Sequence, residues 1–400
     1  MRDQIIKFFG YSLAELKLKG AIHTAREIAQ QPNLWQMTFN NLSESKPGLE
    51  VFLEEVYDND NLDVILTGAG TSAFIGDILE GPFQKNTGKH TRAVATTDLV
   101  SYPTHYLHPE TPTLLISFAR SGNSPESIAA IDIADKLCTK VYHLILTCNS
   151  SGKLATRRDR DNNTFTFLLP SEADDQSLAM TGSFTCMLLA GLLISRISYL
   201  NYLKPQIDQL SGYGENILNN YSEKLKEVTK LDFKRAVFLG SGPLKGTARE
   251  SQLKLQELTD GKVICKYDSF LGFRHGPKAV VDKSTLLVYL FSSDDYVHQY
   301  ELDLVNAANN SEKGIYRIGV IESDSKDSDL DLMIELSDSD VKVDEEFLSV
   351  CSVLPAQMLG FFKAIHLGLE PDSPSVSGAI TRVVQGVTIY PYHLPLEKQV

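Results

Sequence analysis

The stretch DVILTGAGTSAFIGDIL, residues 63–79, indicates the fold of this chain. An apolar, β-branched run leads directly into a glycine-rich turn, and a helical pattern follows the turn, as in the first unit of a parallel α/β sheet. Similar runs lie downstream, separated by amphipathic segments: TRAVATT (91–97), TPTLLISF (111–118), KVYHLILT (140–147) and TFTFLL (164–169). Strands that are linked by helices are buried on both faces, so this order predicts a parallel sheet with helices on either side.

The same order of pieces recurs in the second half of the chain. Three pairs of segments match: 63–79 with RAVFLGSGPLKGTARES (235–251), 111–127 with STLLVYLFSSDDY (284–296), and 141–151 with IYRIGVIESDS (315–325). Matched pieces in a constant order indicate an internal duplication. We therefore predict an α/β protein with two tandem flavodoxin-like domains, each a three-layer sandwich of a parallel sheet between helices.

Composition and pattern suggest the bounds of these parts. They are a helical segment at 1–60, a first domain at 61–200, a second domain at 201–370 and a tail at 371–400. Helical segments around 178–227 are expected to join the halves. The tail is rich in Pro and Ser before a β-like run, RVVQGVTIY (382–390), and either lies across a neighbouring surface or is disordered.

The bulk composition excludes several classes of protein. The 400 residues are 42% hydrophobic and 22% charged, as in an ordinary soluble protein, and the net charge of −13 argues against binding of duplex nucleic acid. We find no signal-peptide pattern and no apolar stretch long enough to span a membrane. The five cysteines are scattered without a C-x-x-C motif, which is typical of reduced thiols in a cytoplasmic protein.

One histidine pair has the spacing of a metal site. His105 and His108 form H-x-x-H in a stretch that contains Pro and Tyr and has no nearby pair of carboxylates. Loop histidines explain this pair better than a zinc site does, so we expect no metal.

Two loops of the first half carry the residues of a phosphate site. In the first, Gly70, Thr71 and Ser72 follow a strand and open a helix, where backbone N–H groups and hydroxyls can hold an anion. The third glycine of a dinucleotide-binding motif is missing. The second loop, 117–127, offers Arg120, Ser121, Asn123 and Ser124 between a strand and a helix. The alternative is that its serines only cap the helix and form the turn.

Two smaller features bear on the same site. The turn TCNSS (147–151) either adds a third rim to the phosphate site or is a plain Asn/Ser turn. The matching loops of the second half read GSGPLKG and FSSDDY, and Asp294 and Asp295 would repel a phosphate. The second half has therefore kept the fold and taken another role.

The second half offers acid/base chemistry instead. Glu250, Lys254 and Glu257 share one face of a predicted helix, either as part of a site or as a solvated stripe of ion pairs. His275 lies in the tight turn RHGP (274–277), where a histidine is a candidate acid or base. Together, these groups could move protons on a bound ligand.

Taken together, these motifs resemble the sugar-isomerase (SIS) domain family, in the tandem arrangement of the isomerase half of glucosamine-6-phosphate synthase. The similarity covers positions 25–390 and includes EIAQQPNLW, GAGTS, ISFARSGNSPES, SLAMTGSFT, ESQLKLQE and FRHGP. The chain is more similar still to the branch of galactosamine-6-phosphate deaminases, also called tagatose-6-phosphate ketose/aldose isomerases. TTDLVSYP, SLAMTGSFT and the expected absence of a glutaminase domain support that branch.

The resemblance implies roles for individual residues. Ser72, Ser121 and Ser124 correspond to phosphate ligands, and Thr181 lies near the sugar. Glu257 corresponds to the carboxylate that moves a proton between C1 and C2, with Glu250 and Lys254 lining the same site. His275 corresponds to a ring-opening histidine that comes from a neighbouring subunit, which implies a homodimer or a higher homo-oligomer with a shared active site.

Three positions depart from the family pattern. Gln385 stands where the synthase has an imine-forming lysine, Met180 where it has a serine, and Arg120 where it has a glutamine. These changes put in doubt a covalent imine with the enzyme.

The resemblance predicts a cytoplasmic hydrolase that converts D-galactosamine 6-phosphate to D-tagatose 6-phosphate and ammonia without a cofactor. Another ketose/aldose phosphate isomerase, a fructosamine-phosphate deglycase and a non-catalytic sugar-phosphate sensor stay open as alternatives.

Overall fold

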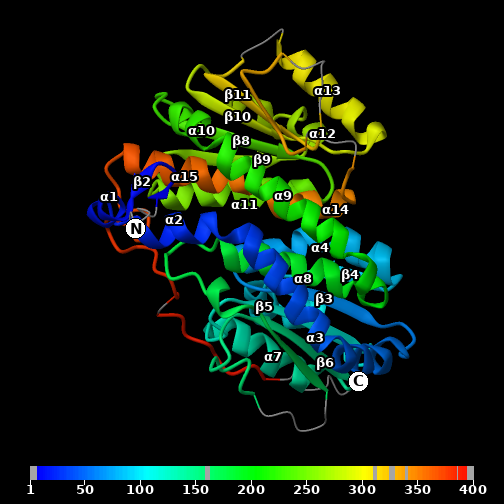
Figure 1. Ribbon diagram of the computed structural model, residues 1–400. Coiled ribbons are helices and arrows are strands. Elements are labelled where there is room, and N and C mark those ends of the chain that lie inside the picture. The colour runs from blue at the N-terminus through cyan, green and yellow to red at the C-terminus, as the bar shows by residue number, and fades with distance from the viewer. Residues whose placement is uncertain are drawn as a thin grey trace, which may run out of the picture.

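Two parallel sheets of five strands each organise the chain, one in each half (Figure 1). The computed structural model describes residues 7–157, 163–309, 313–323, 329–337, 341–384 and 386–393. The first sheet has the order β4-β3-β5-β6-β7 and is formed by β3 (Asp63–Thr67), β4 (His90–Ala93), β5 (Thr113–Ala119), β6 (Val141–Thr147) and β7 (Thr164–Leu168). This sheet confirms the parallel arrangement that the sequence predicts.

The second sheet repeats the first. Its order is β12-β11-β10-β8-β9, formed by β8 (Arg235–Gly240), β9 (Ile264–Asp268), β10 (Thr285–Leu290), β11 (Tyr316–Ile321) and β12 (Leu332–Glu335). When the strands of each half are numbered along the chain, both sheets have the spatial order 2-1-3-4-5, which is the flavodoxin-like topology. The direction of winding reverses beside the first strand of each half. The predicted duplication and fold class are therefore confirmed. The short β9 and β12 were not predicted.

Helices cover both sheets and fill the space between them (Figure 1). Helices α1 to α7 are Leu13–Leu18, Ile22–Ala29, Gln31–Tyr57, Thr71–Thr87, Thr96–Ser101, Pro103–Tyr106 and Pro125–Leu137. Helices α8 to α11 are Gly182–Ile194, Lys204–Asn220, Ser222–Val228 and Pro243–Leu258. Helices α12 to α15 are Phe270–Phe273, Asp295–Asn309, Glu345–Cys351 and Leu354–His366. Short 3-10 turns lie at Ser171–Ala173, Ile197–Tyr202 and Pro277–Val280, and a hairpin of β1 (Lys7–Phe8) and β2 (Tyr11–Ser12) precedes α1.

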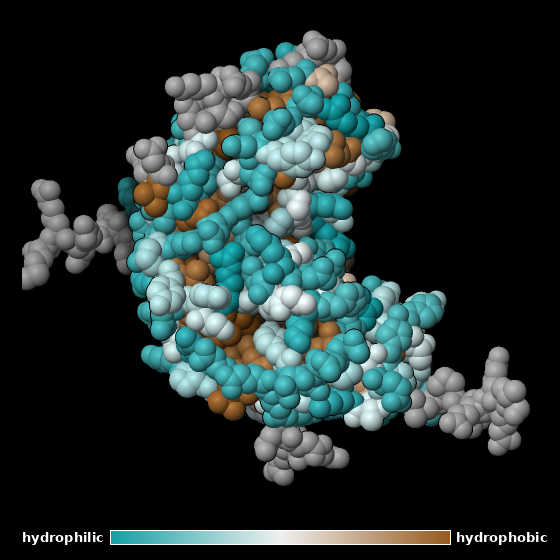
Figure 2. Space-filling model, turned by 90° about the vertical axis from the view of Figure 1, so that its right-hand side faces the viewer, coloured by the Kyte–Doolittle hydropathy of each residue, from teal (hydrophilic) through white to brown (hydrophobic). Residues whose placement is uncertain are grey.

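The first helices of the two halves, α4 and α11, pack against each other. Gly246 of α11 makes this approach possible, because a Cβ atom there would lie 2.5 Å from Cγ1 of Ile78. Each helix also begins after a glycine in the same unusual conformation, with φ 57° and ψ −128° at Gly70 and φ 51° and ψ −128° at Gly242. The seam between the halves is thus made of duplicated elements. In the space-filling view, the outline is hollowed between the two halves, and hydrophilic surface borders the hollow (Figure 2).

Two predicted strands are wrong in part. The run 91–97 is a strand only to Ala93, because the N–H groups of Val94 and Thr96 donate to carbonyls of Leu66 and Gly68 and turn the chain into α5. The β-like run 382–390 forms no strand in its described residues. Within this run, the carbonyl of Arg382 accepts a hydrogen bond from the side chain of Arg120 and not from a neighbouring strand.

One helical stretch, Glu345–His366, is long and apolar enough to cross a membrane by length and composition. The protein buries 94% of its apolar window, as in the core helix of a globular protein.

Candidate active site

The two predicted phosphate loops begin at the same edge of the first sheet. Thr67 pairs with Ser117 across β3 and β5, so the loops that follow these strands lie side by side. Thr71 begins α4 directly after Gly70, and both Thr71 and Ser72 are buried. The Ser72 hydroxyl lies 3.9 Å from the sulfur of Met180. The position that holds a serine in the synthase is thus next to the loop, as the resemblance implies.

Arg120 is a buried cation at the end of β5. Its guanidinium donates to the backbone carbonyls of Ser177 and Leu178, both at 3.4 Å, and of Arg382 at 2.6 Å. In the described part of the chain, no carboxylate lies within ion-pair distance of it, and burial lowers the pKa of Arg120. A buried guanidinium that is held only by neutral carbonyls can still take an anion as its charge partner.

The residues that follow Arg120 are held by neighbouring loops. The side-chain amide of Asn149 donates to the Ser121 carbonyl at 2.9 Å, so the turn 147–151 supports the loop. The side-chain oxygen of Asn123 accepts a bond from the N–H of Lys153 at 3.0 Å. Ser124 precedes α7, and its hydroxyl donates to that of Ser127 at 2.6 Å without capping a backbone N–H group. These side chains stay predicted ligands.

The charged face of α11 is buried. Nζ of Lys254 lies 2.7 Å from Oε2 of Glu257, 3.3 Å from Oε1 of Glu250 and 3.2 Å from the Thr71 hydroxyl. The side chains of Lys254 and Glu250 are 1% and 0% exposed, whereas that of Glu257 is 24% exposed. The alternative of a solvated ion-pair stripe is therefore wrong, because this face packs against the start of α4 from the other half.

Burial sets the protonation of this cluster. Loss of solvent raises the pKa of Glu250 to about 7, although the Lys254 ammonium opposes the shift. The pKa of Lys254 is also raised: burial lowers it, but the charges of Glu250 and Glu257 outweigh that effect. The cluster therefore keeps a cationic Lys254 beside the more accessible carboxylate of Glu257.

A cavity of about 430 Å³ joins the two halves of the candidate site. Thr71 and Arg120 line it from the first half, and Lys254 and Glu257 line it from the second. The remaining walls are Leu178, Met180, Gly378, Ala379, Ile380, Thr381, Arg382 and Val384. A buried guanidinium and a Lys–Glu ion pair thus face one space that fits a small ligand, and this cavity is the candidate active site.

Sequence reasoning missed the tail as a wall of this cavity. The red C-terminal segment in Figure 1 runs from α15 back to the first half, and its residues 378–384 lie at the cavity. Within residues 378–384 the one charged residue is Arg382, which follows Thr381 among small and apolar neighbours. Gln385, where the family lysine is expected, lies outside the described residues.

Buried carboxylates support the loop behind Arg120. Asp175 accepts bonds from the backbone N–H groups of Thr181, Gly182 and Ser183 at 2.8–3.1 Å and so caps α8. It also accepts the Thr181 hydroxyl at 3.0 Å, so this predicted sugar contact has a structural partner. Glu27 accepts the N–H of Gln176 at 2.6 Å, and burial together with the Asp175 charge raises the pKa of Glu27 to about 7.

His275 does not line the cavity of its own chain. It is exposed in the turn between α12 and the 3-10 turn Pro277–Val280, where Gly276 has φ 111°. His105 and His108 are exposed as well, and His105 stacks on Tyr102 with ring centroids 5.1 Å apart. The described residues contain no cluster of three or more His, Cys, Asp or Glu side chains that could hold a metal.

The matching loop of the second half is closed by its own carboxylate. The N–H of Ser292, two residues beyond the end of β10, donates to Oε2 of the fully buried Glu301 at 2.9 Å. The carboxyl group of Glu301 therefore occupies the N–H group of this loop. The loss of phosphate chemistry from the second half stays a prediction.

Comparison with known proteins identifies relatives. Residues 59–195 match the SIS domain family. The chain is 40% identical to a protein from Shewanella sp. (strain ANA-3) named D-galactosamine-6-phosphate deaminase AgaS, with 95% of each chain covered. It is 41% identical to the protein of that name from Escherichia coli, over 92% of this chain and 96% of the other. The E. coli crystal structure described as tagatose-6-phosphate ketose/aldose isomerase superposes with a TM-score of 0.86 at 39% identity, covering 93% and 97% of the two chains.

Proposed function

The chain belongs to the SIS-domain family, in the branch that contains the proteins named D-galactosamine-6-phosphate deaminase, and we propose that it converts D-galactosamine 6-phosphate and water to D-tagatose 6-phosphate and ammonia. One observation carries the proposal: Arg120 of the first half faces the same cavity as Lys254 and Glu257 of the second. An anchored phosphate would place the sugar carbons beside these proton-transfer groups. The reaction needs no metal or organic cofactor in this scheme.

Binding of the phosphate uses the first half. Arg120 supplies a buried positive charge, and the loops at 70–72 and 121–124 supply N–H groups and hydroxyls beside it. Because no carboxylate of the described residues lies within ion-pair distance of the guanidinium, a phosphate would supply its direct charge partner, in addition to the more distant charges of Asp174 and Asp175. Thr181 does not line the cavity, so its place near the sugar rests on the resemblance alone.

Proton transfer uses the second half. In the open-chain sugar, Glu257 takes the proton from C2, and the electrons move into an enolamine between C1 and C2. Lys254 and the Thr71 hydroxyl lie on the Glu257 side of the cavity, where they stabilise the negative charge that develops on the C1 oxygen. Return of the proton to C1 gives a C2 ketimine, with a hydroxyl on C1.

Release of ammonia completes the reaction. Water adds to the ketimine carbon, and the C2–N bond of the resulting carbinolamine breaks as nitrogen leaves with the protons it needs. The products are the 2-ketose phosphate and ammonia, so atoms and charge balance with one water consumed. This is a hydrolytic deamination coupled to an aldose–ketose isomerisation.

Ring opening requires a further acid/base, and the described residues that line this cavity include no histidine. We propose that His275 of a second copy supplies it, in a homodimer or a higher homo-oligomer, because His275 is exposed on its own chain and away from the cavity. Mixing Glu257→Gln and His275→Ala chains tests this. Random exchange of subunits turns about half of the dimers into heterodimers, and each heterodimer has one intact site out of two. The mixture should therefore recover about a quarter of wild-type activity. Absence of any recovery, with exchange of subunits verified, refutes the shared site.

The substrate test measures ammonia. We expect release from galactosamine 6-phosphate to exceed release from glucosamine 6-phosphate, and no isomerisation of amine-free sugar phosphates at a similar rate. Preferential turnover of an amine-free ketose phosphate would favour a simple isomerase instead. Binding without turnover of any of these sugars would favour a sensor. We place the protein in the cytoplasm, since its five cysteines are unpaired.

A further inference from the structure

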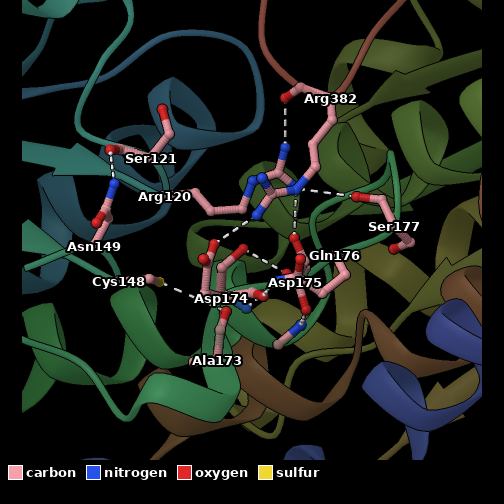
Figure 3. Close-up of polar contacts among 12 residues, drawn as sticks. Arg120, Ser121, Cys148, Asn149, Ala173, Asp174, Asp175, Gln176, Ser177 and Arg382 are labelled. Carbon is pink, nitrogen blue, oxygen red and sulfur yellow. Dashed lines mark hydrogen bonds and ion pairs between the residues drawn. The ribbon is translucent and has the colours of Figure 1, made fainter. Parts of the chain in front are cut away.

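One side chain of the tail, Arg382, ties the tail to the wall of the cavity. Its Nε donates to the Asp175 carbonyl at 2.7 Å, and its guanidinium forms an ion pair with Asp174 at 2.7 Å (Figure 3). Its own carbonyl accepts the bond from Arg120 at 2.6 Å. A single residue of the tail thus bonds both the loop behind the cavity and the predicted phosphate-binding cation.

The rest of the segment is weakly held. In the described part of the chain, the hydrogen bonds that tie residues 376–384 to other parts of the protein involve Arg382, except at the start of the segment, where the N–H of Val376 donates to Asp260 at 3.3 Å. The N–H groups of Gly378 and Ile380 bond only Ser375 of the tail itself. Apolar burial does not replace them, because the side chains of Val376, Ile380 and Val384 are 78%, 40% and 58% exposed. The segment is anchored farther back, where Asp372 accepts the N–H of Thr24 at 2.7 Å. Arg382 is therefore the point at which a solvated segment is fastened over the cavity.

The loop that receives Arg382 is itself rigidly supported. Asp174 and Asp175 lie between the 3-10 turn Ser171–Ala173 and α8, and Asp175 caps α8 through its side chain. Glu27 of α2 holds the next residues through the N–H groups of Gln176 and Ser177. The carbonyls of Ser177 and its neighbour then hold Arg120. Arg382 thus bonds a solvated segment to the loop 174–178, and the same loop holds the guanidinium of Arg120.

We propose that Arg382 is a positioning residue that clasps the segment Val376–Val384 over the cavity and, through its carbonyl, holds Arg120 in the orientation that receives the phosphate. The proposal rests on the proposed function for its kinetic consequence. The clasp itself is a property of the free protein and can be measured without any substrate.

The clasp predicts a specific kinetic signature. If only closed protein binds substrate well, the apparent dissociation constant is the intrinsic constant divided by the closed fraction. Loss of charge-assisted bonds of this kind lowers the equilibrium constant for closure roughly ten-fold or more, and the closed fraction falls by up to the same factor once the open state dominates. Saturating substrate still closes the segment, so Arg382→Ala raises KM for galactosamine 6-phosphate by about ten-fold and leaves kcat within about two-fold. A general folding defect would instead lower kcat, because fewer molecules would be active.

The experiment combines kinetics with hydrogen exchange of the full-length chain. Backbone amides of residues 376–384 are expected to exchange faster in Arg382→Ala and in Asp174→Asn, which removes the partner charge from another element. Arg382→Lys keeps a cation in reach of Asp174 and gives an intermediate KM. In the double variant of Arg382→Ala with Asp174→Asn, KM rises no further than in Arg382→Ala alone, because the two residues form one bond.

A matched control is Arg157→Ala, which removes an arginine that pairs with Asp132 and Asp135 and does not line the cavity. It should change neither KM nor the exchange of 376–384. Unchanged exchange in both clasp variants overturns the proposal, and so does a fall in kcat at constant KM. If the wild type releases no ammonia from the substrate, the proposed function fails, while faster exchange in the clasp variants still supports the clasp.

Discussion

Replacement of Glu257 by Gln separates chemistry from binding in this cavity. The amide keeps the size of the side chain, and its oxygen can still accept the bond that Lys254 now donates at 2.7 Å. Lys254 also keeps Glu250 at 3.3 Å as a charge partner. The substitution therefore removes the proton acceptor and leaves the packing of α11 against α4 intact.

The size of the effect follows from the role of the group. A positioned general base contributes about 10²- to 10⁴-fold to the rate, which corresponds to about 2.7–5.4 kcal/mol of transition-state stabilisation. The groups that we propose to hold the phosphate lie in the other half, around Arg120, and are unchanged. Removal of one negative charge from the cavity does not repel an anionic ligand. We therefore expect kcat for ammonia release to fall by two to four orders of magnitude, with affinity for galactosamine 6-phosphate equal to or slightly above that of the wild type.

An enzyme-coupled ammonia assay gives kcat, and titration calorimetry with the sugar phosphate gives the affinity of the variant. A matched control is Gln256→Ala, one residue before Glu257 and not part of the cavity wall, which should leave kcat near that of the wild type. Turnover of Glu257→Gln within ten-fold of the wild type would refute the assignment of the base. A loss of affinity by more than ten-fold at unchanged fold would show that Glu257 mainly holds the substrate.

Three further predictions concern other parts of the molecule. Replacing both Ser121 and Ser124 by Ala weakens binding of the phosphorylated sugar, by calorimetry, about ten-fold or more; unchanged affinity would place the phosphate elsewhere. Since the pKa of Glu250 is raised to about 7, its contribution to stability is full below pH 4.5 and falls as the pH rises to 7. In urea unfolding, the free energy of unfolding of Glu250→Gln minus that of the wild type should therefore rise from pH 5 to pH 8, by up to about 3 kcal/mol. The same difference at both pH values would contradict this. Gly246→Val lowers the free energy of unfolding by about 1–3 kcal/mol, because its Cβ meets Ile78; a variant as stable as the wild type would show that the helices can separate.

The sequence was enough to predict the sheets and the duplication, because both rest on local patterns. Apolar runs give β3, β5 and β6 within two residues of their observed ends. The run 91–97 failed, because Thr96 turns out of the strand to bond a carbonyl of the neighbouring loop, a contact that no local pattern records.

The candidate site was predictable only in part. The spacing of Glu250, Lys254 and Glu257 places them on one helix face, but their burial depends on α4 of the other half. The bond between Arg120 and the Arg382 carbonyl joins residues 262 positions apart and involves a backbone atom, so no residue type marks it. The tail has no periodicity that would link it to a cavity. These contacts are set by tertiary packing, and the sequence alone does not reveal them.

The carboxylate of Glu301 has a consequence for how the two halves diverged. The N–H group of Ser292 stands three residues beyond Tyr289 of β10, as that of Arg120 stands three residues beyond the matching Ser117 of β5. In the first copy the residue at this position, Arg120, lines the cavity, and in the second its N–H group is bonded to a carboxyl group of α13. The loop of the second copy is thus filled by a carboxyl group of its own domain. A copy filled in this way leaves capture of the substrate, as we propose it, to the other copy, so its first helix is free to carry the acid/base side chains.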